Sequence, residues 1–218
     1  MGTTSVTVSQ VDAPIVNISA NPGPEVCLNE ALTLTANHNV TGLVSFDWYD
    51  QSNPGVSLGG NPSFSPPTNV VGSTTYCVEI YVGFNCSTIE CIEVTVNPLP
   101  TSAFIFTPEF PDIKDSLIFR NQSSGGGTYL WSFGNTGKQS TMKNPIYKFN
   151  DTGIHYVSLY TINNFGCKHE STKVISIKPE FKVYIPNSFT PNGDGINDYF
   201  IPYVEGSETY KLRIFSRW

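Results

Sequence analysis

The chain has 218 residues and a formal charge of -6, because 12 Lys and Arg stand against 18 Asp and Glu. This balance gives no electrostatic attraction for nucleic acid or for an anionic membrane surface, so both partners are disfavoured. Apolar residues occur in short alternating runs, a pattern that is typical of β-strands and too short for a helical membrane span. Because 18 Gly and 16 Pro interrupt these runs, we predict an all-β protein of several small domains.

Residues 1–12 do not resemble a signal peptide, because MGTTSVTVSQ lacks a basic start followed by an apolar stretch. The segment TSVTVSQVDAP is instead similar to IEVTVNPLP from Ile92 and to VISIKP from Val174, where predicted strands run into proline-bearing linkers. We therefore interpret residues 1–12 as the last strand of a preceding repeat or as a linker, and the chain as part of a longer array. Chance similarity between strands rich in Thr and Val is the alternative.

A first domain is predicted over residues 13–97. Its strand candidates are separated by turn-forming Gly and Pro residues, and they cover residues 32–36, 44–50, 74–82 and 91–96. Several short strands, with Trp48 on one and a Tyr-Cys pair at Tyr76 on a later one, resemble a bacterial immunoglobulin-like sandwich. We expect Trp48 to pack between two sheets; a sugar-stacking platform is the alternative.

A second domain is predicted over residues 98–179. The segments YLWSFGNTG and NPIYKFNDTGIHYVSLYTINNFGC resemble the polycystic kidney disease (PKD) domain, whose motif continues Phe-Gly with Asp-Gly. Asn135 and Thr136 replace that Asp-Gly pair, which puts an acidic metal-ligand role in doubt. Tyr129, Trp131 and Phe133 alternate onto one strand face and are predicted to form part of the core of another sandwich.

The third segment covers residues 180–218. Its sequence IPNSFTPNGDGINDYF, followed by YKLRIFSRW, resembles the start of the gliding-motility-associated C-terminal domain, the type B sorting signal of type IX secretion in Bacteroidetes. The resemblance implies an extracellular, cell-surface protein whose partners are the type IX machinery and an outer-membrane protein. Without the later strands of that family, we expect this incomplete β domain to be disordered or to pair with another chain.

The candidate partner-binding residues lie within this third segment. Its turns could present backbone groups for strand addition while the aromatic rings fill pockets on a partner. The set consists of Pro186, Asn187, Phe189, Pro191, Asn192, Gly193, Asp194, Gly195, Asn197, Asp198, Tyr199 and Phe200.

No cofactor is predicted, although the oxygen-bearing side chains of PNGDGIND raise the question of calcium. Asn192, Asp194, Asn197 and Asp198 are spaced roughly alternately, but no glutamate stands at the twelfth position of an EF-hand loop. Asn-Gly and Asp-Gly pairs are also strong turn formers, with side chains that bond their own backbone. We favour the turn over the metal.

The five cysteines show no zinc-binding spacing, so disulfides are predicted. Cys77 and Cys91 lie symmetrically about the centre of a predicted hairpin, which places them opposite each other within bonding range. A bond from Cys27 to Cys77 and free thiols are open alternatives, but Cys27 is predicted to pair with Cys86 or with Cys167. In the second case, Cys27 would connect the two domains and Cys86 would be left to bond an upstream domain.

An enzyme is not predicted, because none of the three histidines lies in a nucleophile elbow or a zinc-binding helix motif. The sequence favours part of a secreted adhesin-like protein that is exported by type IX secretion and attached to the cell surface. A surface polysaccharide is a candidate ligand. A carbohydrate-binding or spacer module of an extracellular hydrolase is the alternative.

Overall fold

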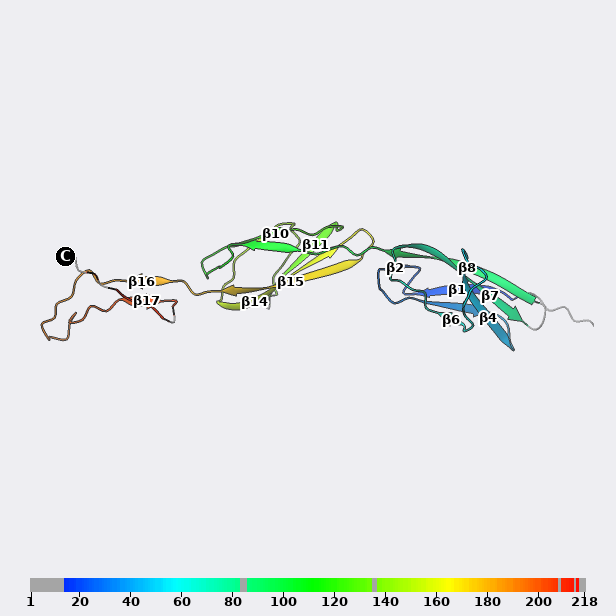
Figure 1. The fold of residues 1–218 in the computed structure, drawn as a ribbon, viewed down its shortest axis with the longest axis horizontal. Coiled ribbons are helices and arrows are strands. Elements are labelled where there is room, and N and C mark those ends of the chain that lie inside the picture. Colours follow the sequence, from blue (N-terminus) through cyan, green and yellow to red (C-terminus); the bar gives the residue numbers. More distant parts are fainter. Residues whose placement is uncertain (1–13, 83–85, 135–136, 208, 214, 216–218) are drawn as a thin grey trace, which may run out of the picture. The chain divides into compact units, whose positions relative to one another are not determined.

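The computed structural model describes residues 14–82, 86–134, 137–207, 209–213 and 215. Its regular elements are β-strands, and they divide into two compact units (Figure 1). The first unit comprises Met1–Leu99 and Phe165–Cys167, and the second comprises Pro100–Asn164 and Lys168–Trp218. The strand predicted within residues 1–12 lies outside the described residues. Within the described ranges, no helix has the length and hydropathy needed to cross a membrane.

The first unit is a sandwich of a three-stranded and a five-stranded sheet. The smaller sheet has the order β1-β3-β6, with bounds Val16–Asn21, Thr33–His38 and Ser63–Phe64. The larger sheet has the order β2-β8-β7-β4-β5, with bounds Glu25–Cys27, Cys86–Asn97, Gly72–Val82, Val44–Asp50 and Ser57–Gly59. Strand β2 pairs with β8 in parallel and the other neighbours are antiparallel.

The core of the first unit lies between these two sheets and draws on both of them. Trp48 of β4 is fully buried, and its indole Nε1 donates a 2.8 Å hydrogen bond to the carbonyl oxygen of Asn61. The ring of Trp48 stacks on Phe64, which in turn contacts Tyr76. Trp48 is therefore a core residue with its one polar atom satisfied, and it offers no exposed ring to a sugar.

The β7–β8 hairpin is longer than the sequence pattern indicates, since β8 begins at Cys86 and not near residue 91. The predicted boundary was wrong because residues 86–90 are mostly polar and lack an apolar face, although they pair with β7 throughout. Cys77 and Cys91 are direct cross-strand partners and form a disulfide with a Cα–Cα distance of 4.0 Å.

Of the predicted alternatives for Cys27, the structure contains the bond to Cys167, with a Cα–Cα distance of 5.6 Å. Residues 165–167, which include Cys167, belong to the first unit. Cys86 is the cysteine outside both disulfides.

The second unit contains a sandwich of a three-stranded and a four-stranded sheet. The order β13-β10-β9 has the bounds Ile146–Tyr147, Leu117–Asn121 and Phe104–Thr107. The order β12-β11-β14-β15 has the bounds Gln139–Ser140, Thr128–Phe133, Gly153–Ile162 and Lys168–Ile177.

Aromatic side chains fill the centre of this second sandwich. Trp131 and Phe133 are buried, Tyr129 packs at the edge, and the ring of Trp131 contacts Phe104 and Phe119 from the facing sheet. The indole Nε1 of Trp131 donates to the carbonyl oxygen of Met142 at 2.8 Å. The alternation at residues 129, 131 and 133 thus builds one side of the core, as the sequence indicates.

Residues after β15 form a small hairpin in which β16 (Lys182–Tyr184) pairs antiparallel with β17 (Tyr203–Glu205). The expectation that this segment would be disordered or would pair with another chain was wrong for these residues, because β17 supplies the partner for β16 within the same chain. The described residues of the KLRIF motif, by contrast, are not in a strand.

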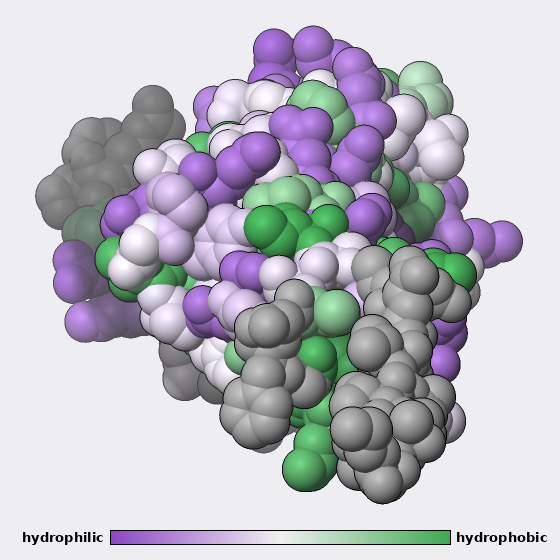
Figure 2. Space-filling model, turned by 90° about the vertical axis from the view of Figure 1, so that its right-hand side faces the viewer, coloured by the Kyte–Doolittle hydropathy of each residue, from purple (hydrophilic) through white to green (hydrophobic). Residues whose placement is uncertain are grey.

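The face drawn in Figure 2 mixes residue types, with small groups of hydrophobic residues among hydrophilic ones. Isolated apolar side chains on a surface are ordinary, so they do not by themselves indicate an interface.

Candidate functional site

The candidate site is the loop of residues 185–202, which the β16–β17 hairpin closes at its base. Lys182 and Glu205 are cross-strand partners and their side chains form an ion pair at 3.7 Å. Glu180 forms a second ion pair with Lys182, at 3.1 Å, and another with Lys114. Hydrogen bonding to Lys114 lowers the pKa of Glu180, and the bond to Glu180 raises the pKa of Lys182. The ion pair between Lys182 and Glu205 holds the two strands together at the base of the loop.

Asp198 organises the centre of the loop. Its Oδ1 accepts hydrogen bonds from the backbone N–H groups of Asn192 (3.1 Å) and Gly193 (2.7 Å). Its Oδ2 accepts from the N–H of Gly195 at 2.7 Å. One carboxylate therefore accepts hydrogen bonds from three backbone N–H groups of the PNGDG turn. Hydrogen bonds from Gly193 and Gly195 lower the pKa of Asp198, because they favour its charged form.

Asp194 also accepts hydrogen bonds within the same turn. Its carboxylate accepts from the N–H of Ile196 at 2.8 Å and from Nδ2 of Asn192 at 2.9 Å. The first of these bonds is the main cause of its lowered pKa. Gly193 and Gly195 have φ angles of 77° and 83°, a region that L side chains rarely adopt. The alternation of Gly with Asp is thus required by backbone geometry as well as by hydrogen bonding.

Aromatic side chains flank this turn. The rings of Phe189 and Phe200 meet edge to face with centroids 6.0 Å apart, and the N–H of Thr190 donates to the carbonyl oxygen of Asn197 at 2.7 Å. Tyr199 is 77 % exposed, so its ring projects into solvent from a fixed backbone. Beside it lies a hollow of about 340 Å³ that is lined by Pro186, Ser188, Gly195, Asn197, Asp198, Tyr199 and Ile201.

The structure brings together most of the predicted partner-binding residues within this loop. It also adds three contributors that the sequence did not single out. Ile196 and Ile201 are exposed apolar residues that precede and follow Asp198 in the loop. Gly206 follows β17 at a position where a Cβ atom would lie 2.3 Å from the carbonyl oxygen of Glu180. The steric signal at Gly206 depends on a contact with residue 180, which no local sequence pattern reveals.

Acid is expected to open the loop. A carboxyl group with a depressed pKa in the folded state stabilises that state above its unfolded pKa, and this contribution is lost as the pH falls through the folded value. For Asp198, lowering the pH well below the ordinary pKa of about 3.9 should release the three N–H donors. The amide signals of Gly193 and Gly195 in NMR spectra should then move toward random-coil positions. An Asp198→Ala variant, which has no side-chain acceptor, should show the opened signals at neutral pH, and pH-independent signals in the native chain would contradict this assignment.

The two carboxylates of this segment form the side-chain to backbone hydrogen bonds that are typical of a turn. Both carboxylates accept hydrogen bonds from backbone N–H groups, which are donors that bind anions. A Ca²⁺ ion would instead be surrounded by six to eight oxygen ligands. Across the residues that the structure describes, no group of three His, Cys, Asp or Glu side chains could hold a metal ion. We therefore expect equal thermal unfolding midpoints in 5 mM calcium and in excess chelator. A calcium-dependent rise of several degrees would restore the metal assignment.

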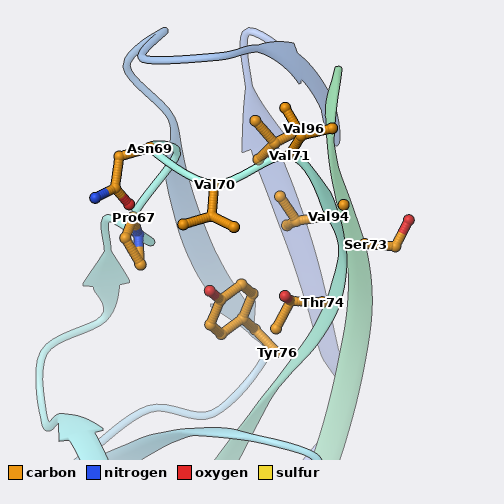
Figure 3. A pocket seen from close by; sticks show the side chains of 10 residues that line it. Pro67, Asn69, Val70, Val71, Ser73, Thr74, Tyr76, Val94 and Val96 are labelled. Carbon is orange, nitrogen blue, oxygen red and sulfur yellow. The ribbon is translucent and has the colours of Figure 1, made fainter. Parts of the chain in front are cut away.

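A second hollow, of about 290 Å³, lies in the first unit. Figure 3 shows the side chains of Val70, Val94 and Tyr76 around it, with Thr74 beside the tyrosine. Burial raises the pKa of Tyr76, and none of the residues that line this cavity carries a formal charge. The cavity could take a small apolar group, but it contains no assembled acid, base or nucleophile.

The histidines of the second unit have structural partners. Nδ1 of His169 accepts a hydrogen bond from the backbone N–H of Ser102 at 2.9 Å, while the hydroxyl of Ser102 donates to the carbonyl oxygen of Leu159. His155 packs against Phe149, and its Nε2 lies 3.2 Å from the carbonyl oxygen of Asp151. Ser102 and His169 therefore meet without forming a nucleophile–base pair.

Comparison with known proteins found one family that matches the first unit and a set of solved structures with similar β-sandwich folds. Residues 12–100 match the model of a family described as an Ig-like domain, CHU_C associated. A search of curated proteins found no match.

Solved structures with similar folds include three bacterial modules. The PKD1 domain of the Vibrio cholerae metalloprotease PrtV is 28 % identical, with 36 % of this chain and 96 % of that chain covered and a TM-score of 0.32. The fibronectin(III)-like modules of Clostridium thermocellum CbhA are 11 % identical, with coverages of 75 % and 95 % and a TM-score of 0.43. The Bacteroides ovatus protein SGBP-B, solved with a mixed-linkage heptasaccharide, is 11 % identical, with coverages of 78 % and 48 % and a TM-score of 0.33. The predicted all-β class with tandem immunoglobulin-like sandwiches is confirmed.

Proposed function

We propose that this chain is part of a secreted, adhesin-like cell-surface protein in which residues 180–218 direct type IX export and surface attachment. The observation that carries the proposal is the loop organised by Asp198. Its backbone is fixed by hydrogen bonds, yet Ile196, Tyr199 and Ile201 project from it with about two thirds or more of their surface exposed. A rigid turn that presents exposed apolar side chains loses little conformational entropy when a partner covers them.

Two further features support the proposal. Disulfides persist in oxidising compartments, and two of them connect cysteines of this chain. The match of residues 12–100 to an immunoglobulin-like family indicates the modular architecture that is common in extracellular proteins. In this account the two sandwiches act as spacers and recognition modules, and the loop engages the type IX machinery and an outer-membrane partner protein. Neither a catalytic activity nor a cofactor is part of the proposal.

The alternative function, a carbohydrate-binding module, is less well supported. Planar sugar rings bind to exposed aromatic faces, but Trp48 and Trp131 are both completely buried with their indole N–H groups bonded inside the protein. These two tryptophans are core residues and offer no stacking platform.

A pull-down from Bacteroidetes outer membranes tests the proposed role of the loop. The baits are the whole chain, a copy that ends at Pro179, Asp198→Ala, and the matched control Glu109→Ala, which removes an exposed carboxylate outside the loop. We expect the whole chain and Glu109→Ala to capture the same outer-membrane protein, and the other two baits to lose it. Equal capture by all four baits, or capture by none, would count against the loop as the recognition element.

A further inference from the structure

The acidic and basic residues are distributed very unevenly along the chain. Residues 1–100 contain eight Asp and Glu and no Lys or Arg, whereas all 12 basic residues follow residue 100. The ion pairs found among the described residues likewise all lie beyond residue 113. The carboxylates of the first unit therefore have no basic side chain of their own unit to neutralise them.

Several of these carboxylates lie on one surface, the outer face of the β8-β7-β4-β5 sheet. In a strand, alternate residues point to opposite faces, and Val78 and Ile80 of β7 point into the core. Their neighbours on β7 therefore point outward together with their cross-strand partners. We define the outer face by Asp47, Tyr49, Glu79, Tyr81 and Ile89. The strands β8, β7 and β4 that carry it are labelled in Figure 1.

At the centre of the outer face, Asp47 and Glu79 are direct cross-strand partners. Like charges in opposed positions destabilise a sheet, and residues in such positions have Cβ atoms about 5 Å apart. Asp47 accepts a hydrogen bond from the hydroxyl of Ser57, a neutral donor that leaves its charge in place. The carboxylate pair is therefore a local conflict within the free protein, of the kind that is retained at functional positions.

Two tyrosines flank this carboxylate pair along the strands. Tyr81 is two residues after Glu79 on β7 and pairs with Ser45 of β4. Tyr49 is two residues after Asp47 on β4 and pairs with Cys77 of β7. Hydrogen bonding to Glu79 raises the pKa of Tyr81, and burial together with the charges of Glu79 and Asp47 raises the pKa of Tyr49. Both phenols thus lie within the field of the carboxylates. Ile89, 51 % exposed, extends the same row as an apolar neighbour of Glu79.

We propose that the outer face binds an arginine-bearing segment of a partner protein. The guanidinium group carries the positive charge that this unit lacks, and its planar donors match a carboxylate in a bidentate geometry. The same group stacks on aromatic rings, for which Tyr49 and Tyr81 lie on either side of the pair. A lysine ammonium would satisfy the charge without the planar stacking. This surface is separate from the loop of residues 185–202, so the inference does not depend on the sorting role.

An NMR titration of the 218-residue chain tests the assignment. The probe is a twelve-residue peptide with four arginines at alternate positions, and the comparison probes are its lysine counterpart, calcium chloride and a mixed-linkage glucan oligosaccharide. We expect the arginine peptide to shift the signals of Tyr49, Tyr81 and Ile89, and to bind several-fold more tightly than the lysine peptide. Shifts of this face caused by calcium or by the oligosaccharide, without a preference for arginine, would overturn the proposal.

Two double variants separate a specific site from general charge attraction. Asp47→Asn with Glu79→Gln neutralises the central pair, whereas Glu25→Gln with Glu90→Gln removes the same charge elsewhere in the first unit. Glu90 is opposite the buried Val78 and so lies on the other side of β8 from Ile89. Loss of two charge-assisted contacts should weaken arginine-peptide binding by at least about tenfold in the first variant. An equal loss in the second variant would show that only net charge matters, and would contradict a built site.

The stability of the free protein provides an independent test. Glu79→Gln removes the repulsion with Asp47 while the amide keeps an acceptor for Tyr81, so the unfolding midpoint should rise by about 1 to 4 °C at neutral pH. Glu90→Gln is the control and should leave the midpoint unchanged. A variant that binds the arginine peptide less tightly and is more stable fits a binding residue. A lower midpoint for Glu79→Gln would instead identify the carboxylate as structural.

Discussion

Replacing Trp131 by alanine is expected to lower the free energy of unfolding of the second unit by about 3 to 5 kcal/mol, the range for removing a large aromatic residue from a core. Trp131 is completely buried and contacts Phe104 and Phe119 across the sandwich. Its loss would leave a cavity and an unpaired carbonyl oxygen at Met142. Because small domains are stable by about 5 to 15 kcal/mol, the change would remove a large part of the total.

Urea unfolding followed through NMR methyl signals of the second unit measures this effect. Tyr156→Ala is the matched control, because Tyr156 lies on the neighbouring strand β14 with 58 % of its surface exposed. That change should alter the free energy of unfolding by less than about 0.5 kcal/mol. Trp131→Phe should have an intermediate effect, since it keeps an aromatic ring but loses the hydrogen bond. Similar losses for Trp131→Ala and Tyr156→Ala would mean that Trp131 is not at the centre of the core.

Removing the Cys77–Cys91 disulfide is expected to lower the stability of the first unit by about 3 kcal/mol. The bond closes a loop with a sequence separation of 14 residues, and the chain-entropy model gives this amount for a loop of about 15. The two cysteines are direct partners in the β7–β8 hairpin, so a double change to alanine leaves the strand pairing in place. The effect therefore comes mainly from the greater freedom of the unfolded chain.

Comparison of urea unfolding curves for the native chain and Cys77→Ala/Cys91→Ala tests this prediction. Cys86→Ser is the appropriate control, because Cys86 lies on the same hairpin outside both disulfides. Its unfolding curve should overlay the native one, whereas the double variant should have a lower midpoint. Unchanged stability in the double variant would show that the crosslink contributes little to this sandwich.

Much of the fold could be predicted from residue periodicity. The alternation at Trp131 and Phe133 and the run at residues 44–50 correspond to strands with buried inward faces. Two-residue strands such as β6 and β13 could not be predicted, because two residues contain no period. These strands depend on the neighbours that they pair with, β3 and β10, and those partners are distant in the sequence.

The cysteines show the same limit. Cys77 and Cys91 could be paired from hairpin symmetry, which is a local property. The partner of Cys27 could not be decided, because the candidate Cys167 is 140 residues away and its proximity depends on the arrangement of complete strands. A sequence pattern therefore identifies the crosslink within one hairpin, and only tertiary structure selects the second one.

Residue types in the sequence single out the candidate loop, but its hydrogen bonding was not apparent in the sequence. Asp194 and Asp198 have the oxygen atoms of metal ligands, and the structure directs both carboxylates at backbone N–H groups instead. The positive φ angles of Gly193 and Gly195 turn those N–H groups inward. The distinction between an anion-centred turn and a cation site depends on backbone direction, which side-chain spacing alone does not fix.

Display of the chain on living cells tests whether residues 180–218 direct type IX export and surface attachment. The chain would be placed behind an export signal in a gliding Bacteroidetes strain and in its derivative without type IX secretion, each carrying the native sequence, Asp198→Ala or Glu109→Ala. Protease digestion of intact cells measures the fraction at the surface. We expect the native chain and Glu109→Ala to be digested only in the secreting strain, and Asp198→Ala to stay protected. Equal digestion in both strains, or protection of the native chain in both, would contradict this expectation.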